Sequence, residues 1–333
     1  MNQQSRTAPT RREGSVTKRM MLVSGGAHPA LAESIAAHLG TTVAPRTAHV
    51  FANGETFVRF GKSMRGCDVF VLQSFTEPIN TWLLEALITV DALKRASAKR
   101  ITVILPFYPY GRQDKKHRGR EPISARLVSD LFATAGANRI MTVDLHTAQT
   151  QGFFDGPVDH LLAQPLLADH IRGSHPTAAI TVVAPDSGRV RLAERWADLL
   201  GGCPIAFVQH RDALQGRHPD ATQIVGDVEG RLCVVVDDMI DTGATMAGAT
   251  RLLLGKGASS VVAAATHGLF SGDAAEHLTD SGIHQVVVTD TLPIPPAQHF
   301  PQLTVLTIAP LLARAIREVF DDGSVTSLFD GHA

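Results

Sequence analysis

The stretch Val234–Met246, VVVDDMIDTGATM, decides the fold of this chain. Its consecutive valines predict a strand that is buried on both faces, and Asp237 and Asp238 follow them directly. The remaining residues are mostly small or carry hydroxyl groups, as expected for a loop that leads into a helix. Carboxylates and an anion site repel one another. The pattern therefore indicates one ligand with hydroxyl groups at one place and a phosphate at another.

Elsewhere, short apolar runs alternate with longer segments of helical periodicity. DVFVLQS at residues 68–74 and RITVILPFY at residues 100–108 are two such runs, and a helical segment at residues 78–98 separates them. Continuous apolar strands separated by helices predict parallel sheets covered on both faces, the α/β class. A chain of 333 residues exceeds what one core usually serves, so we expect two domains. Similar segments from Arg65 and Glu229 favour two related halves, although every strand–helix–strand unit shares this rhythm.

The composition excludes several classes of function. A formal net charge of −1 gives no indication of nucleic acid or of an anionic membrane as a partner. No apolar run approaches the roughly 18 residues that a membrane span needs. The three cysteines are scattered, which favours unreactive thiols in a reducing compartment. We interpret the polar residues 1–20 as a disordered tail, and we expect a cytoplasmic protein.

The loop after the apolar strand is suited to a phosphate. It brings backbone N–H groups and hydroxyls to the start of a helix, where an anion binds without a lysine. The residues concerned are Asp241, Thr242, Gly243, Ala244 and Thr245. Asp237 and Asp238 can accept hydrogen bonds from a ribose diol. An ordinary turn capped by an aspartate explains one acid but not three, so the pattern predicts a sugar-phosphate site.

At these residues the chain resembles a known family. VVVDDMIDTGATM resembles the phosphoribosyl-diphosphate signature that phosphoribosyltransferases share with ribose-phosphate diphosphokinases. Asp144–Asp159, DLHTAQTQGFFDGPVD, resembles the diphosphokinase signature and would be unexplained in an ordinary transferase. Glu85–Leu127 and Ser324–Asp330 are similar to the same family. The resemblance to bacterial ribose-phosphate pyrophosphokinases covers residues 20–330.

The resemblance implies two tandem phosphoribosyltransferase-like domains, each a mainly parallel sheet flanked by helices. After the tail, we expect an N-terminal domain at residues 21–157 on the ATP side and a C-terminal domain at residues 158–333 on the ribose 5-phosphate side. It also implies a homohexamer built from dimers, with the N-terminal half in much of the interface. ADP and phosphate are the expected effectors.

The resemblance also implies the nucleotide and metal ligands. The candidates for ATP binding are Phe51, Asn53, Gly54, Glu55, Arg112, Gln113 and Asp114. Phe51 is expected to stack on adenine, although FANGE stands where family members often carry a serine and an acid. The basic loop at residues 110–120 suits a polyphosphate, whereas an isolated basic loop is more often a solvated surface. His146 and Asp186 match the positions of the family's Mg²⁺ ligands, and no Cys/His cluster has the spacing of a zinc site.

The implied reaction transfers the diphosphoryl group of MgATP to the C1 hydroxyl of ribose 5-phosphate and releases AMP. In the family a loop carries a catalytic lysine and, two residues later, an arginine. Arg211 matches the arginine and is also a candidate ligand of ribose 5-phosphate, but Gln209 and His210 stand where the lysine is expected. His210 and Arg211 are therefore the candidate catalytic residues, with Arg217 or Lys115 as other sources of positive charge. Without the lysine, a regulatory homologue that binds ligands and does not turn over is the alternative.

Overall fold

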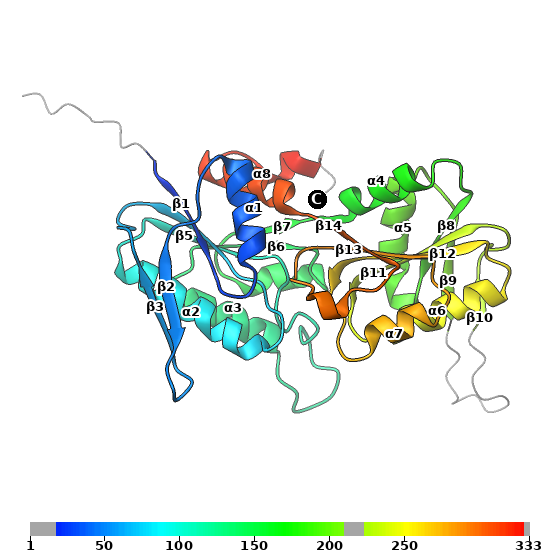
Figure 1. Ribbon diagram of the computed structural model, residues 1–333, viewed down its shortest axis with the longest axis horizontal. Coiled ribbons are helices and arrows are strands. Elements are labelled where there is room, and N and C mark those ends of the chain that lie inside the picture. Colours follow the sequence, from blue (N-terminus) through cyan, green and yellow to red (C-terminus); the bar gives the residue numbers. More distant parts are fainter. Residues whose placement is uncertain (1–17, 210–222, 330–333) are drawn as a thin grey trace, which may run out of the picture.

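The computed structural model describes residues 18–209 and 223–329. Figure 1 shows two α/β units side by side, with helices on both sides of each sheet. This confirms the α/β class and the parallel sheets predicted from the apolar runs. Of the expected tail, residues 1–17 lie outside the described part, and Met20 already begins the first strand. No helix among the described residues is both long and apolar enough to cross a membrane.

The first sheet has the strand order β1-β4-β5-β6-β7, and all its strands are parallel. Its strands are β1 (Met20–Ser24), β4 (Asp68–Leu72), β5 (Arg100–Leu105), β6 (Arg139–Val143) and β7 (Val158–Leu161). Helices α2 (Ile79–Arg95) and α3 (Ser124–Ala135) pack on one face. The other face carries α1 (Pro29–Leu39) and α8 (Ala309–Phe320). Every residue of β4 is buried, because helices cover both of its sides.

The second sheet has the order β10-β9-β8-β11-β12-β13-β14, and only β10 runs antiparallel to its neighbour. Its strands are β8 (Ile180–Ala184), β9 (Ile205–Gln209), β10 (Gln223–Val225), β11 (Leu232–Ile240), β12 (Ser260–Gly268), β13 (Gln285–Thr289) and β14 (Leu303–Leu306). Helices α4 (Gln164–Ser174) and α5 (Val190–Leu199) cover one face. Helices α6 (Ala244–Gly255) and α7 (Ala274–Thr279) cover the other.

Several short elements complete the fold. The hairpin of β2 (Arg46–Val50) and β3 (Thr56–Phe60) forms a separate antiparallel sheet. The 3₁₀ helices η1 (Ala148–Phe153) and η2 (Ser187–Arg189) follow β6 and β8. Single turns η4 (Pro296–Gln298) and η5 (Val325–Phe329) lie near the end of the chain.

Two elements belong to the first unit although they lie beyond residue 157. Strand β7 pairs with β6 and therefore forms the edge of the first sheet. Helix α8 returns from the second sheet and buries its apolar face against α1 (Figure 1). Both placements differ from the boundary expected at residues 157 and 158. The helix that follows the last strand of the second sheet therefore packs in the core of the first unit.

Candidate active site

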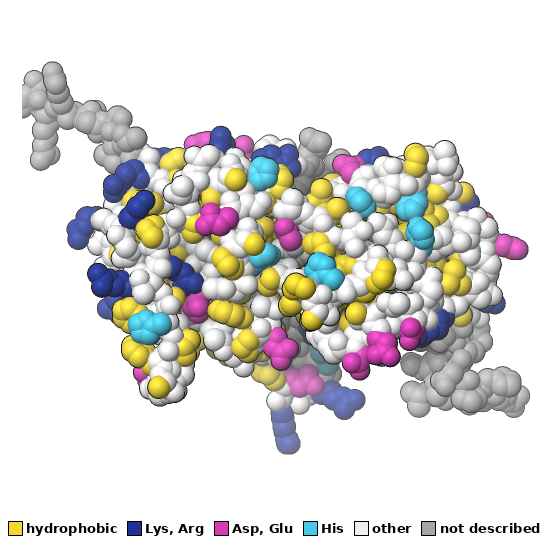
Figure 2. Space-filling model, viewed as in Figure 1, with side chains coloured by type: hydrophobic (Ala, Val, Ile, Leu, Met, Phe, Trp, Pro, Cys, Tyr) yellow, Lys and Arg dark blue, Asp and Glu magenta, His cyan; other side chains and the backbone are white. Residues whose placement is uncertain are grey.

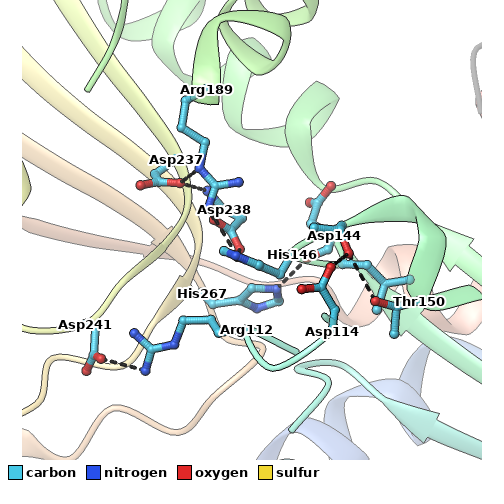
Figure 3. Close-up of polar contacts among 12 residues, drawn as sticks. Arg112, Asp114, Asp144, His146, Thr150, Arg189, Asp237, Asp238, Asp241 and His267 are labelled. Carbon is cyan, nitrogen blue, oxygen red and sulfur yellow. Dashed lines mark hydrogen bonds and ion pairs between the residues drawn. The ribbon is translucent and has the colours of Figure 1, made fainter. Parts of the chain in front are cut away.

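The site lies where the carboxyl ends of the two sheets face each other. His146 follows β6 of the first sheet, and Asp238 lies on β11 of the second. The His146 ring nitrogen Nδ1 is 2.8 Å from the Asp238 oxygen Oδ2 (Figure 3). Ligands of open α/β sheets bind at the carboxyl ends of the strands, so this contact marks the expected position of a site.

Strand β11 is longer than the sequence analysis assumed. Asp237 and Asp238 do not end it, because the strand continues to Ile240 and Asp237 pairs with Ala265 of β12. Its pairing with β8 on the other side stops earlier, at Val235. The two acids therefore have a neighbouring strand on one side only.

The phosphate loop has the form expected from the sequence. Asp241, Thr242 and Gly243 connect β11 to α6, which begins at Ala244. Gly243 has φ +72°, and a Cβ there would lie 3.1 Å from the carbonyl oxygen of Ala274. No side chain in the described part of the chain caps this helix end, so its first backbone N–H groups can face an anion.

A cleft of about 300 Å³ joins the phosphate loop to Asp237, the first of the two acids. It is lined by Arg112, His146, Arg189, Asp237, Met239, Ile240, Asp241, Thr242, Gly243, Thr245 and Met246. Arg112 Nη2 lies 2.9 Å from Asp241 Oδ2, so a residue of the first unit reaches the loop of the second (Figure 3). The cleft therefore brings a cation of the predicted ATP side to the predicted phosphate loop.

Arg189, which the sequence analysis did not select, joins the two acids. Its Nε is 2.7 Å from Asp237 Oδ1, and its Nη2 is 2.6 Å from Asp238 Oδ1 (Figure 3). The signal in the sequence was its place in TVVAPDSGRV, three residues after Asp186 at the carboxyl end of a parallel strand.

The two acids differ in their ionisation. Burial raises the pKa of Asp237 to about 8, the neighbouring Asp238 adds to the rise, and Arg189 opposes it. Burial also disfavours the charged form of Asp238, but hydrogen bonds from His146 and Asp237 and the charge of Arg189 outweigh it and lower the pKa of Asp238. Two adjacent buried carboxyl groups therefore carry about one negative charge at neutral pH.

A buried polar network holds the strand end that carries His146. The Asp144 carboxylate accepts hydrogen bonds from Ala163 N at 2.9 Å, from Gln164 Nε2 at 3.1 Å and from Thr266 Oγ1 on β12 at 2.6 Å. His267 Nε2 donates to the Asp144 carbonyl oxygen at 3.1 Å. Burial lowers the pKa of His267, so the ring is neutral. The network ties β6 of the first sheet to β12 of the second.

Both predicted metal ligands, His146 and Asp186, carry donor atoms that can bind Mg²⁺, but their hydrogen-bond partners differ. Asp186 caps η2, and its Oδ1 accepts a hydrogen bond from Gly188 N at 2.7 Å. His146 Nδ1 contacts Asp238 instead, which leaves Nε2 for a ligand. Within residues 18–209 and 223–329, no group of three or more His, Cys, Asp or Glu side chains is arranged to hold a metal ion. His146 and Asp186 therefore supply at most one atom each, and a metal would need ligands from a substrate.

The predicted ATP residues fall into two separate groups. Phe51, Asn53, Gly54 and Glu55 form the exposed tip of the β2–β3 hairpin, which points away from the cleft (Figure 1). The Phe51 side chain is 47% exposed. The structure does not bring this tip to the cleft of its own chain.

The second group begins the loop between β5 and α3. Arg112 and Gln113 are exposed, whereas Asp114 is buried and accepts hydrogen bonds from Thr147 Oγ1 at 2.6 Å and Gln149 Nε2 at 2.7 Å. The basic side chains further along are exposed, and Figure 2 shows basic side chains projecting at the bottom of the view, where this loop lies. Their exposure agrees with a solvated run. His210, Arg211 and Arg217 lie outside the described residues.

The fold and the cleft define an α/β protein of the phosphoribosyltransferase type. A model of the N-terminal domain of ribose phosphate pyrophosphokinase matches residues 20–136, and a phosphoribosyl synthetase-associated domain matches residues 207–330. The chain therefore belongs to the ribose-phosphate pyrophosphokinase family.

Individual relatives agree with this assignment. The chain is 61% identical to the ribose-phosphate pyrophosphokinase of Mycobacterium leprae, over 95% of this chain and 97% of that relative. Identity to the Corynebacterium glutamicum enzyme of the same name is 59%, with the same coverage. The crystal structure of phosphoribosylpyrophosphate synthetase from Mycobacterium smegmatis has a TM-score of 0.88 and 59% identity, and the match covers 92% of this chain and all of that chain.

Proposed function

We propose that the cleft between the two units is the active site of an ATP-dependent ribose-phosphate diphosphokinase. The enzyme transfers the diphosphoryl group of ATP to the C1 hydroxyl of ribose 5-phosphate and gives phosphoribosyl diphosphate and AMP. Nothing in the comparisons favours the regulatory homologue that the missing lysine suggested. The single observation that carries the proposal is that Asp237 of β11, the phosphate loop and His146 line one cleft.

The second unit binds the sugar phosphate in this proposal. The uncapped start of α6 and the residues Asp241–Thr245 take the 5-phosphate, because backbone N–H groups at a helix start attract an anion. Asp237 accepts hydrogen bonds from the ribose hydroxyls, and Asp238, whose oxygens contact Arg189 and His146, supports the site from behind it. Asp237 lines the cleft, so it is the acid that meets the sugar first.

ATP binds from the side of the first unit. Arg112 and Gln113 are exposed beside the cleft and are suited to its phosphates, and buried Asp114 holds their loop in place. None of the tip residues Phe51–Glu55 lines the cleft of its own chain. We propose that they reach the ATP of a neighbouring copy, which makes the enzyme a homo-oligomer.

Other features carried over from the family belong to the same proposal. They are a hexameric assembly, ADP and phosphate as effectors at subunit interfaces, and a cytoplasmic location.

The donor set fits Mg²⁺ at His146 and Asp186. A lowered pKa for Asp238 means that His146 Nδ1 carries the proton in their hydrogen bond, so the Nε2 lone pair can bind a metal. Asp186 keeps Oδ2 for the same purpose. Mg²⁺ commonly takes one or two protein ligands and completes its shell with phosphate oxygens and water. When bound, it neutralises negative charge on the transferring phosphoryl oxygens.

The chain's own residues supply position and charge for the transfer. Arg112 orients the phosphates, and the acids of β11 hold the ribose so that its C1 hydroxyl faces them in line. We propose that His210 and Arg211, which follow β9 directly, add positive charge where the family has its lysine loop. Such charge stabilises the transition state more than the ground state.

Calorimetric titration of the Asp237→Asn variant tests the division of the cleft. We expect its affinity for ribose 5-phosphate to fall roughly tenfold or more, because an amide NH₂ group replaces the oxygen of Asp237 that accepts from the sugar, with little change for ATP. Asp227→Asn, at an exposed acid just before β11, is the matched control and should bind both ligands normally. An equal loss of both ligands in Asp237→Asn would contradict the division.

A further inference from the structure

Arg189 occupies a gap that the sheet leaves beside the two acids. Strand β8 ends at Ala184, while β11 continues to Ile240, so Asp237 and Asp238 have no strand on that side. The chain turns through η2 after β8, and this turn places the Arg189 side chain in the gap. The Arg189 guanidinium therefore contacts the acids on the side where β8 no longer pairs with β11.

One edge of the guanidinium contacts both carboxyl groups. Side chains at successive positions of a strand point to opposite faces, so neighbouring acids do not ordinarily share a partner. Here Nε is 2.7 Å from Asp237 Oδ1 and Nη2 is 2.6 Å from Asp238 Oδ1. This edge usually binds the two oxygens of a single carboxylate. The rigid, planar group therefore fixes the two carboxyl groups relative to each other.

The contacts also determine which oxygen is left for a ligand. Asp238 uses Oδ1 with Arg189 and Oδ2 with His146, and only 7% of its side chain is exposed. Asp237 uses Oδ1 with Arg189 and with the backbone N–H of Asp238, at 2.7 and 2.8 Å. The second oxygen of Asp237, Oδ2, has no contact of this kind among the described residues. Asp237 also lines the cleft, so this oxygen can accept from a ribose hydroxyl.

Arg189 also connects the sugar side to the first unit. Its Nη2 lies 3.2 Å from His146 Nδ1, and because both nitrogens carry hydrogen, they share the Asp238 carboxylate and do not bond to each other. The Arg189 side chain lines both the cleft and a smaller polar cavity of about 100 Å³ behind it. The Arg189 side chain is 20% exposed, so a substrate bound in the cleft can contact it.

We propose that Arg189 is a positioning residue for ribose 5-phosphate: its forked contact aims Asp237 Oδ2 at the sugar hydroxyls and holds Asp238 on His146. This inference rests on the proposed assignment of Asp237 to the sugar. A lysine at this position keeps the positive charge but offers a single ammonium nitrogen, which cannot lie 2.7 Å from one carboxyl group and 2.6 Å from the other as Nε and Nη2 do. Replacing Arg189 by lysine therefore separates the effect of the positive charge from the effect of the planar geometry.

The test is steady-state kinetics of the full-length Arg189→Lys and Arg189→Gln variants, with Arg191→Lys as the matched control. Arg191 lies on the same short segment and is exposed. We expect Arg189→Lys to raise KM for ribose 5-phosphate roughly tenfold to a hundredfold, with KM for ATP and Tm close to those of the unmodified enzyme. Arg189→Gln should raise it at least as much, and Arg191→Lys should change nothing.

Asp237→Asn, measured in parallel, separates failure of this inference from failure of the proposed site. An unchanged KM for ribose 5-phosphate in both Arg189 variants, with a raised KM in Asp237→Asn, overturns the role of Arg189 and leaves the sugar site standing. A lower Tm and kcat with both KM values unchanged means that Arg189 only supports the fold. Unchanged KM values in all three variants overturn the sugar site and the inference together.

Discussion

The left-handed conformation of Gly243 gives the most direct test of how the phosphate loop is built. A Gly243→Ala variant must either keep φ near +72°, which costs a residue with a Cβ about 1–2 kcal/mol, or change the loop. The new Cβ would also lie 3.1 Å from Ala274 O and from Leu278 Cγ, which is tighter than ordinary contact. We expect a total loss of about 1–3 kcal/mol, which corresponds to a fall in Tm of roughly 2–6 °C.

The assay is thermal unfolding with and without a saturating concentration of ribose 5-phosphate. A ligand that binds only the folded chain raises Tm according to its affinity, so a distorted loop reduces that rise. Gly248→Ala is the matched control in the same helix, because its Cβ would meet nothing within 4 Å. Since glycine weakens a helix interior, Gly248→Ala should stabilise the protein by about 0.5–1 kcal/mol and keep the full ligand response.

Two results would refute this reasoning. If Gly243→Ala has the Tm and ligand response of the unmodified protein, the loop does not need a left-handed residue. If Gly248→Ala lowers Tm as much as Gly243→Ala does, any added methyl group disturbs α6 and the argument from φ fails.

Three other substitutions test separate parts of the account. Thr266→Val removes the hydroxyl that donates to Asp144 at 2.6 Å and should lower the free energy of unfolding in urea by about 1–3 kcal/mol. The control Thr142→Val removes a buried hydroxyl with no partner among the described residues and should lower it less. Equal losses would contradict the network. Asp237→Asn should raise Tm of the metal-free protein at pH 8 and raise it less toward pH 4. Because the pKa of Asp237 is raised to about 8 in the folded state, its carboxyl destabilises the fold increasingly as pH rises from about 4. A gain in Tm that does not depend on pH would argue against this. His210→Ala should slow turnover by an order of magnitude or more while His210→Lys keeps or increases it, and unchanged rates in both would remove His210 from the mechanism.

Local sequence patterns were enough to predict the strand–loop–helix unit of the proposed sugar-phosphate site. The run VVVDDMIDTGATM contains the strand, the acids, the left-handed glycine and the start of the helix within a few residues. Their relative positions follow from the geometry of one strand–loop–helix unit, so no distant contact is needed to infer them. The exception is the length of β11, because two acids after an apolar run look like a strand end even when the backbone continues in the sheet.

Contacts between distant segments could not be predicted in this way. Arg189 meets the acids of β11 only because β8 stops short of them, and strand lengths on both sides decide that gap. The network of Asp144 joins residues 122 positions apart, from Asp144 to Thr266. Strand β7 and helix α8 likewise join the first unit through packing that their own sequences do not reveal.

The position of the β2–β3 hairpin shows another limit. The family resemblance assigned Phe51 and its neighbours to ATP, but no pattern in one chain indicates whose ATP they contact. In the structure the tip is exposed and does not line the cleft of its own chain. Its proposed contact with the ATP of a neighbouring copy therefore depends on oligomer formation.

The measurement that tests the central claim most directly is AMP release from ATP and Mg²⁺ by the purified full-length protein, with and without ribose 5-phosphate. Our account predicts AMP only when the sugar is present, in amounts equal to the phosphoribosyl diphosphate formed. No AMP, although both ligands bind, would contradict the claim that this cleft, with Gln209 and His210 in place of the family lysine, transfers a diphosphoryl group.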